Sequence, residues 1–259
     1  MFAAFLGCML SEHMSLRLVS HDVWIVGIAL QVLLAAVMLA KRTWQTYPMF
    51  TAYVFFNLFG AAIGYAVFGN KVVYFYTYFA CESIGIVLGL GVVREIFTNV
   101  FSPHPALRKL ATIIFRVAVI ALIVLAGGVI YAQSGNAKSI IHAVLLAEEA
   151  ARIVEVGLIM FLFLSSSAFG LHWRQNVFGM ALGLGMFTAV ELVTVTLIGH
   201  VSSTTAQAFN LARGISFSAS LLIWVGYMLA PERATTAVEV PKRAQLEQWN
   251  QAVMELISR

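Results

Sequence analysis

Charged and amide side chains inside long apolar stretches are the residues of this sequence best suited to chemistry. They are Gln31, Asn57, Glu82, Glu148, Arg152, Glu155, Glu191, Asn210 and Arg213. An ionised side chain at lipid depth is costly unless it is paired or hydrated. The chemistry open to such a set is ion pairing, the binding of a small polar ligand, or proton transfer.

Spacing and depth predict which of these side chains meet. Glu148, Arg152 and Glu155 share one helix face, so Arg152 is expected to bridge both acids. At about 1.5 Å of rise per residue, Glu155, Glu191 and Arg213 reach similar depths, and we expect them to converge. Glu82 has no basic residue within four positions on its own helix, so its partner must come from elsewhere.

The acids outnumber the bases in this set. Counting Glu149, five intramembrane acids face two intramembrane arginines, a net charge of −3 if all are ionised. Since like charges at low dielectric favour the neutral carboxyl, at least one acid is expected to stay protonated. Three interpretations remain open: a buried ion-pair network, a polar pocket that opens outward, and a proton relay.

Several other chemistries lack their residues. No lysine lies in a predicted span, which excludes a retinal-type Schiff base. The sequence contains no GxSxG, HExxH or Walker motif, and no predicted span contains an aspartate. We therefore expect no catalytic residues, no metal site and no enzyme activity, and the sequence identifies no cofactor.

The elements that must position these residues are membrane helices. Of the 259 residues, 61% are hydrophobic and 11% are charged, which excludes a soluble globular protein, a disordered chain and a nucleic-acid binder. Long apolar runs without alternation predict helices that cross the lipid, because every backbone group must be satisfied internally. Seven are predicted, at 23–40, 48–68, 73–93, 111–132, 140–166, 177–199 and 208–230. The fold class is all-α, a polytopic seven-helix bundle.

The basic residues predict its orientation, because they accumulate on the cytoplasmic side. One side carries eleven: Lys41, Arg42, Arg94, Arg108, Lys109, Arg116, Arg174, Arg233, Lys242, Arg243 and Arg259. The other carries three: Arg17, Lys71 and Lys138. We therefore expect the amino terminus outside and the carboxyl terminus inside.

The segments outside the spans suggest where partners bind. Residues 1–22 are expected to be extracytoplasmic, 23–230 to form the bundle, and 231–259 to form a cytoplasmic tail. Within the tail, 241–258 has the apolar spacing of an amphipathic helix on the membrane surface. Only one connection, 94–110, is long enough for a surface helix. Besides the lipid bilayer, a membrane or cytoplasmic protein could bind at 94–110 or 241–258.

Glycine and proline positions describe the helices further. Small residues four apart, such as Gly85 with Gly89 and Gly179 with Gly183, predict close helix packing. All five prolines lie at span ends or in connections, whereas secondary transporters usually bind substrate at interrupted helices.

Five stretches resemble a known family. They are YPMFTAYVFF (47–56), YFYTYFACESIGIVLGLGVVREIF (74–97), SPHPALRKL (102–110), ARIVEVGLIMFLFLSS (151–166) and LHWRQNVFGMALGLGMFTAVEL (171–192). Together they resemble a family of uncharacterised bacterial seven-helix integral membrane proteins, over about 20–230. The resemblance implies this topology and a bacterial inner (plasma) membrane. It implies no activity, substrate or site residue.

Unbroken helices, short connections and a polar centre favour a receptor or sensor with a small-ligand pocket in the outer half of the bundle. Two other functions remain open: a structural or accessory subunit of a membrane complex, and a proton- or ion-coupled transporter that uses the intramembrane carboxylates.

Overall fold

The computed structural model describes residues 14–67, 69–102, 105–132, 137–168, 173–198 and 203–230. These ranges form α2 (Met14–Ala40), the 3-10 helix η1 (Thr43–Gln45), α3 (Pro48–Val67), α4 (Lys71–Val100), α5 (Pro105–Ala132), α6 (Ala137–Ala168), α7 (Gln175–Ile198) and α8 (Ser203–Leu229). The described residues include no strand, so the all-α fold class is confirmed.

Six of these helices are long and apolar enough to cross a membrane. The qualifying stretches are Asp22–Ala40, Pro48–Val67, Val73–Val100, Glu148–Ala168, Gln175–Leu197 and Thr205–Leu229. In α5, the apolar stretch within the described residues is shorter, Thr112–Val124. The architecture is therefore that of a multi-pass helical membrane protein, while the seventh crossing and the orientation stay predictions.

Several helices extend beyond the predicted spans. α2 begins at Met14, well before the predicted start at residue 23. α4 continues to Val100 and α5 begins at Pro105, which leaves no room for a separate surface helix in 94–110. No proline interrupts α4 before its end at Val100, and Pro103 follows shortly after it. Pro105 lacks an N–H donor and fits at the first position of α5, where that donor would have no partner within the helix. Most of the predicted N-terminal segment lies outside the described residues. The predicted amphipathic helix at 241–258 lies entirely outside them.

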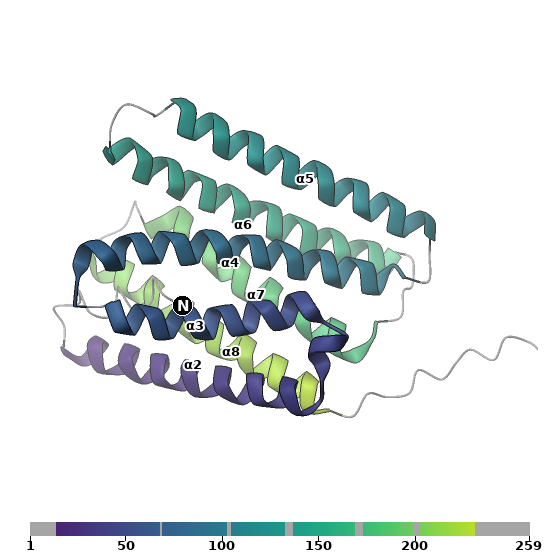
Figure 1. Cartoon of the computed structure of the whole chain (residues 1–259), viewed down its shortest axis with the longest axis horizontal. Helices are drawn as coiled ribbons and strands as arrows, with labels where there is room; N and C mark the ends of the chain where they lie inside the picture. Colours follow the sequence, from purple (N-terminus) through teal and green to yellow (C-terminus); the bar gives the residue numbers. More distant parts are fainter. Residues whose placement is uncertain are drawn as a thin grey trace, which may run out of the picture.

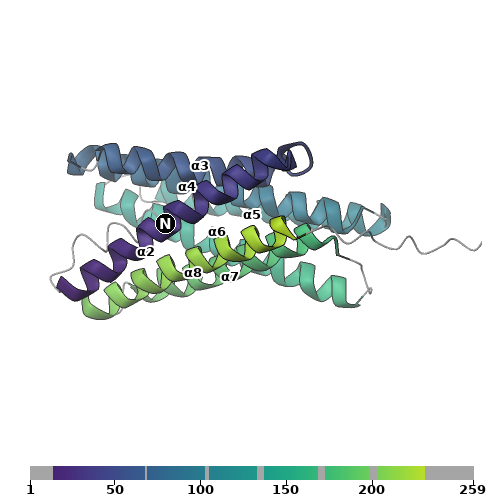
Figure 2. The same ribbon diagram turned by 90° about the horizontal axis from the view of Figure 1, so that it is seen from below.

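The helices lie side by side, with α5 at one edge of the bundle and α2 at the opposite edge (Figure 1). α6 packs against α5, α4 and α7, and α8 packs against both α7 and α2. Figure 2 shows α2 crossing obliquely between the α7–α8 pair and α3. α4, α6, α7 and α8 thus surround the polar residues, and α2 and α3 complete the bundle beside them.

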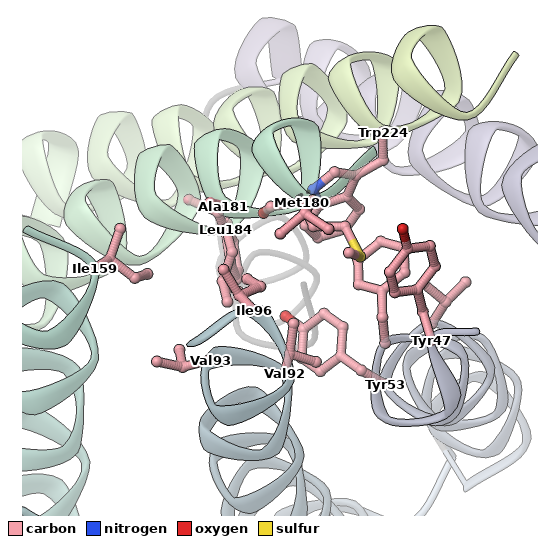
Figure 3. Packing of buried hydrophobic residues seen from close by; sticks show 14 of the residues in the cluster. Tyr47, Tyr53, Val92, Val93, Ile96, Ile159, Met180, Ala181, Leu184 and Trp224 are labelled. Atoms are coloured by element: carbon pink, nitrogen blue, oxygen red, sulfur yellow. Dashed lines mark hydrogen bonds between the residues drawn. The ribbon is translucent and has the colours of Figure 1, made fainter. Parts of the chain in front are cut away.

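The apolar core gathers in one half of the bundle, which we call the apolar half. It lies at the end that holds η1 and the connection between α4 and α5. Trp224 of α8 is its largest fully buried side chain and points toward α3 and α7 (Figure 3). Its ring meets Phe50 edge-to-face at 5.1 Å between centroids, and its Nε1–H donates to the Met180 carbonyl oxygen at 3.4 Å. Such aromatic pairs add to the free energy of burial.

Two charged side chains fasten helix ends in the apolar half. The Glu95 carboxylate of α4 accepts hydrogen bonds from the Met49 and Phe50 N–H groups, at 3.1 and 2.9 Å. These donors belong to the first turn of α3 and have no partner within that helix. At the other side, Lys41 Nζ donates to the Met228 carbonyl oxygen at the end of α8, at 2.6 Å. Both contacts match a side-chain charge to a helix dipole.

Candidate functional site

Four helices bring their intramembrane charges to one place. We call this group the charge cluster: Glu82 of α4, Glu148, Arg152 and Glu155 of α6, Glu191 of α7, and Arg213 of α8. It lies in the half of the bundle opposite the apolar half. This end holds the start of α4, α6 and α8 and the end of α7, so the antiparallel helices bring the six residues to neighbouring depths.

Arg152 joins three helices through its guanidinium. Its Nη1 donates to Glu155 Oε2 at 2.9 Å, one turn along α6. Its Nη2 lies 2.7 Å from Glu82 Oε1 and 2.7 Å from Glu191 Oε2. Of the two expected contacts of Arg152 on α6, the one with Glu155 is present, and the structure gives none with Glu148. Arg152 instead links Glu155 to acids of α4 and α7.

Arg213 completes the cluster from α8. Its Nη2 and Nε both donate to Glu191 Oε1, at 2.6 and 2.9 Å. The same Nη2 lies 3.8 Å from Glu148 Oε1 and 4.0 Å from Glu82 Oε1. Glu191 is thus shared between the two arginines, and Glu148 pairs with Arg213 across helices.

The cluster is buried and carries unequal numbers of acids and bases. Only Glu82 has notable exposure, 14% of its side chain, whereas Glu155 has none and Glu191 has 1%. Among the described residues, four carboxylates face two guanidiniums, a formal charge of −2 when every one of these six groups is ionised. An unpaired buried charge is strongly unfavourable, so this excess favours a neutral carboxyl or a further positive charge nearby.

Some polar atoms of the cluster lack a hydrogen bond. Within the described ranges, Glu148 Oε1, Glu155 Oε1 and Arg152 Nε have no hydrogen-bond partner, and Glu191 Oε2 has only its ion pair with Arg152 Nη2 at 2.7 Å. Three of the four are acceptors, and all belong to side chains that are nearly or fully buried. Among these atoms, the site therefore has more unused hydrogen-bond acceptors than unused donors.

Gly89 lets α4 approach α6 closely at the cluster. A Cβ atom built on Gly89 would collide with Glu155 Oε1, so the carboxylate lies directly against the α4 backbone. Gly85, one turn earlier, has nothing within 4 Å of the same position. The predicted close packing of this pair is therefore present at Gly89 and missing at Gly85.

Three predicted residues lie apart from the charge cluster. Asn57 donates to the Tyr53 carbonyl oxygen of its own helix at 2.8 Å. Gln31 is buried on α2, and its Oε1 accepts no hydrogen bond among the described residues. Asn210 is half-buried on α8, one turn before Arg213. None of the three bonds to the cluster within the described part of the chain.

Glu149 also differs from the expectation. Its Oε1 accepts a hydrogen bond from Thr196 Oγ1 at 3.0 Å, on an exposed face of α6 and α7. The charge cluster thus contains four acids instead of five, because consecutive residues on a helix point about 100° apart.

The partners of two structurally important residues were not predicted. Gly89 sets the approach of α4 to α6, and Glu95 holds the start of α3. Pro48 indicated the start of a helix, but no sequence pattern shows which distant carboxylate meets that helix end. The spacing of Gly85 and Gly89 indicated packing without showing the partner.

No group of three or more His, Cys, Asp or Glu side chains is arranged to hold a metal ion within the described residues. No family model, curated protein or solved structure matches the chain.

Proposed function

We propose that this protein is a multi-pass membrane receptor or sensor whose ligand is a proton bound at the charge cluster. The observation that carries the proposal is the excess of four carboxylates over two guanidiniums among the described residues of one buried site. A proton bound to a carboxylate oxygen reduces the negative charge without needing a cavity, and the ion pair between Arg213 and Glu191 at 2.6 Å stays in place. A larger cation would have to separate those ion pairs.

The unsatisfied oxygens support the same ligand. Glu155 Oε1 and Glu148 Oε1 have no hydrogen-bond donor within the described residues. A protonated carboxyl is a donor as well as an acceptor, so one bound proton both reduces the negative charge and supplies a hydrogen bond. The proton is therefore shared among acids that face one another, and no single oxygen needs to hold it.

The placement of the cluster supports access from one side. Glu82 is the most exposed of its carboxylates, and the cluster lies in the half of the bundle that the basic residues predict to be outside. The apolar half, with Trp224 and Phe50, fills the opposite end. A site with one partly exposed carboxylate and an apolar core beyond it suits a receptor better than a continuous conduction path.

A second candidate is proton-coupled transport through the same cluster. The observation that favours it is that the six residues come from four helices, so a change in protonation alters contacts between helices. Rearranged helix contacts are what a transporter needs to change access from one side to the other. Both candidates assume a seventh crossing by α5 and a carboxyl terminus inside the cell, in a bacterial inner membrane.

Glu82→Gln tests the proposal, because glutamine keeps the shape of the protonated acid and cannot titrate. Purified full-length protein is moved from alkaline toward neutral pH in unbuffered detergent solution, and the protons taken up per molecule are counted. We expect Glu82→Gln to take up about one proton fewer than the unmodified chain, because it lowers the excess of carboxylates over guanidiniums in the cluster as a whole. Glu149→Gln is the matched control, since it removes a half-buried carboxylate that bonds to Thr196 outside the charge cluster and should leave proton uptake by the cluster unchanged.

Proteoliposomes that contain a pH-sensitive dye separate the two candidates. A receptor binds protons without moving them, so dye signals should equal those of protein-free vesicles. Transport is supported by a proton flux that Glu82→Gln abolishes and Glu149→Gln retains. Equal proton uptake by wild type and a folded Glu82→Gln variant, with no flux in either, would overturn both candidates and leave a purely structural ion-pair network.

A further inference from the structure

A groove between α4 and α5 lies away from the charge cluster and has its own chemistry. It has a volume of about 280 Å³. Its lining consists of two arginines, two threonines and four apolar side chains: Arg94, Phe97, Thr98, Thr112, Phe115, Arg116, Val119 and Ile120. All eight belong to the described residues of the two helices.

The lining changes in polarity along the groove. Thr98 and Thr112 lie nearest the connection between α4 and α5, and Val119 and Ile120 lie furthest from it. Arg94 lies at about the depth of Thr112, and Arg116 lies one turn further along α5. The polar and charged side chains therefore lie toward the connection, and the groove ends in apolar side chains toward the centre of the bundle.

Both guanidiniums are unpaired within the described part of the chain. Arg94 and Arg116 are exposed, and neither forms an ion pair with a described carboxylate. The nearest acid in sequence, Glu95, is directed at the first turn of α3. Arg116 also lies inside the apolar stretch Thr112–Val124, where an unpaired charge facing lipid is costly. Two positive charges at one groove thus call for an anion from outside the chain.

We infer that this groove binds the headgroup phosphate of an anionic phospholipid, with an acyl chain lying along its apolar end. The guanidiniums supply the hydrogen-bond donors, because the Thr98 hydroxyl already donates to the Arg94 and Glu95 carbonyl oxygens at 3.0 and 2.9 Å. Arginine is well suited to phosphate because its fork presents paired donors. Phe115, Val119 and Ile120 provide the surface for the chain, which a soluble phosphate would leave unused.

The placement in the bundle agrees with this ligand. The groove lies at the end predicted to be cytoplasmic, where basic pockets between membrane helices meet anionic headgroups. α5 packs mainly on α6, so a lipid between α4 and α5 would tie the edge helix to the rest of the bundle.

Lipid titrations of the full-length protein in detergent test the inference. Native mass spectrometry gives the concentration of dioleoyl phosphatidylglycerol at which half of the protein carries one lipid. We expect saturable binding of a single lipid, which the Arg94→Gln, Arg116→Gln double variant weakens about thirtyfold, from about 1 kcal/mol for each basic residue. Arg42→Gln is the matched control, because it removes an exposed arginine at the same end of the bundle and outside the groove.

Two further arms identify the part of the ligand that is recognised. Dioleoyl phosphatidylcholine should bind no more tightly to wild type than to the double variant. Inorganic phosphate should not displace phosphatidylglycerol. Displacement at millimolar phosphate would show that the groove binds a soluble anion and not a lipid. Val119→Trp fills the apolar end without changing charge and should also weaken phosphatidylglycerol binding. Unchanged binding in a folded double variant, or in Val119→Trp, would overturn the inference.

Discussion

Arg152 is the residue on which the charge cluster most depends. Its guanidinium contacts acids of α4, α6 and α7, while its own side chain is almost fully buried. Removing it would leave Glu82, Glu155 and Glu191 with a single remaining guanidinium, that of Arg213. The cost of burying an unpaired charge, more than the loss of any one hydrogen bond, sets the effect of such a substitution.

We expect Arg152→Gln to destabilise the folded protein by about 3–5 kcal/mol, the usual range for breaking a buried ion pair on one side. The measurement is the melting temperature of purified protein in detergent. Adding Glu155→Gln should recover part of the loss, since it removes one of the stranded carboxylates. Additive losses in the double variant would mean that the two side chains do not interact.

At the scale of whole elements, glycines decide how closely the helices approach. In α7, Cβ atoms built on Gly179 and Gly183 would overlap the rings of Tyr227 and Trp224 of α8. Ser220 of α8 adds a hydrogen bond to the Gly183 carbonyl oxygen at 2.8 Å. The predicted small-residue interface is thus the contact surface between α7 and α8, and it positions Glu191 opposite Arg213.

Gly183→Ala should therefore destabilise the protein by about 1–3 kcal/mol, because the Trp224 indole has no space into which to move. Gly226→Ala on α8 is the control, since nothing lies within 4 Å of its Cβ position. Alanine there should be neutral or slightly stabilising, as it is the better helix former. The measurement is the melting temperature of both variants in the same detergent. Equal melting temperatures would contradict this role for Gly183.

Gly89 gives the corresponding prediction for α4 and α6. Gly89→Ala should displace the Glu155 carboxylate and alter neutral-range proton uptake, whereas Gly85→Ala should leave the uptake as it is. The same proton count that tests Glu82→Gln measures this difference. A Gly89→Ala protein with unchanged uptake would show that the position of Glu155 does not matter to proton binding.

The elements were largely predictable and their contacts only partly so. Apolar runs predicted the spans because lipid-exposed segments must be apolar over their whole length. Equal depth predicted that Glu155, Glu191 and Arg213 meet, since antiparallel neighbours match in height. Helix rotation is set by packing, so the sequence did not reveal that Glu149 meets Thr196 of α7 or that Asn57 bonds within α3. The Glu95 contact with α3 likewise depends on tertiary structure.

At the scale of the whole molecule, the described bundle has a charged half and an apolar half, and its function depends on which faces outward. In a chain with Cys8 and Cys81 replaced by serine, Trp44→Cys and Gly69→Cys place single thiols at exposed positions of opposite ends. We expect a membrane-impermeant maleimide applied to intact cells to label Gly69→Cys and to spare Trp44→Cys until the cells are lysed.

Ser134→Cys extends this test to the seventh crossing. If α5 crosses the membrane, the connection between α5 and α6 lies on the same side as residue 69, so it should label in intact cells as well. Labelling of Trp44→Cys in intact cells would contradict the predicted orientation. Protection of Ser134→Cys in intact cells would contradict the predicted crossing by α5.

The division of the bundle into two halves has an electrical consequence. A membrane potential falls mainly across the layer of lowest dielectric, which here is the apolar half around Trp224. A charge that crosses the whole field gains about 2.3 kcal/mol per 100 mV. A proton that reaches the charge cluster from its own end of the bundle, without passing the apolar half, crosses only a minor part of that field. Its binding should therefore depend little on voltage, and a sensor built in this way would report acidity at one face of the membrane independently of how strongly the cell is energised.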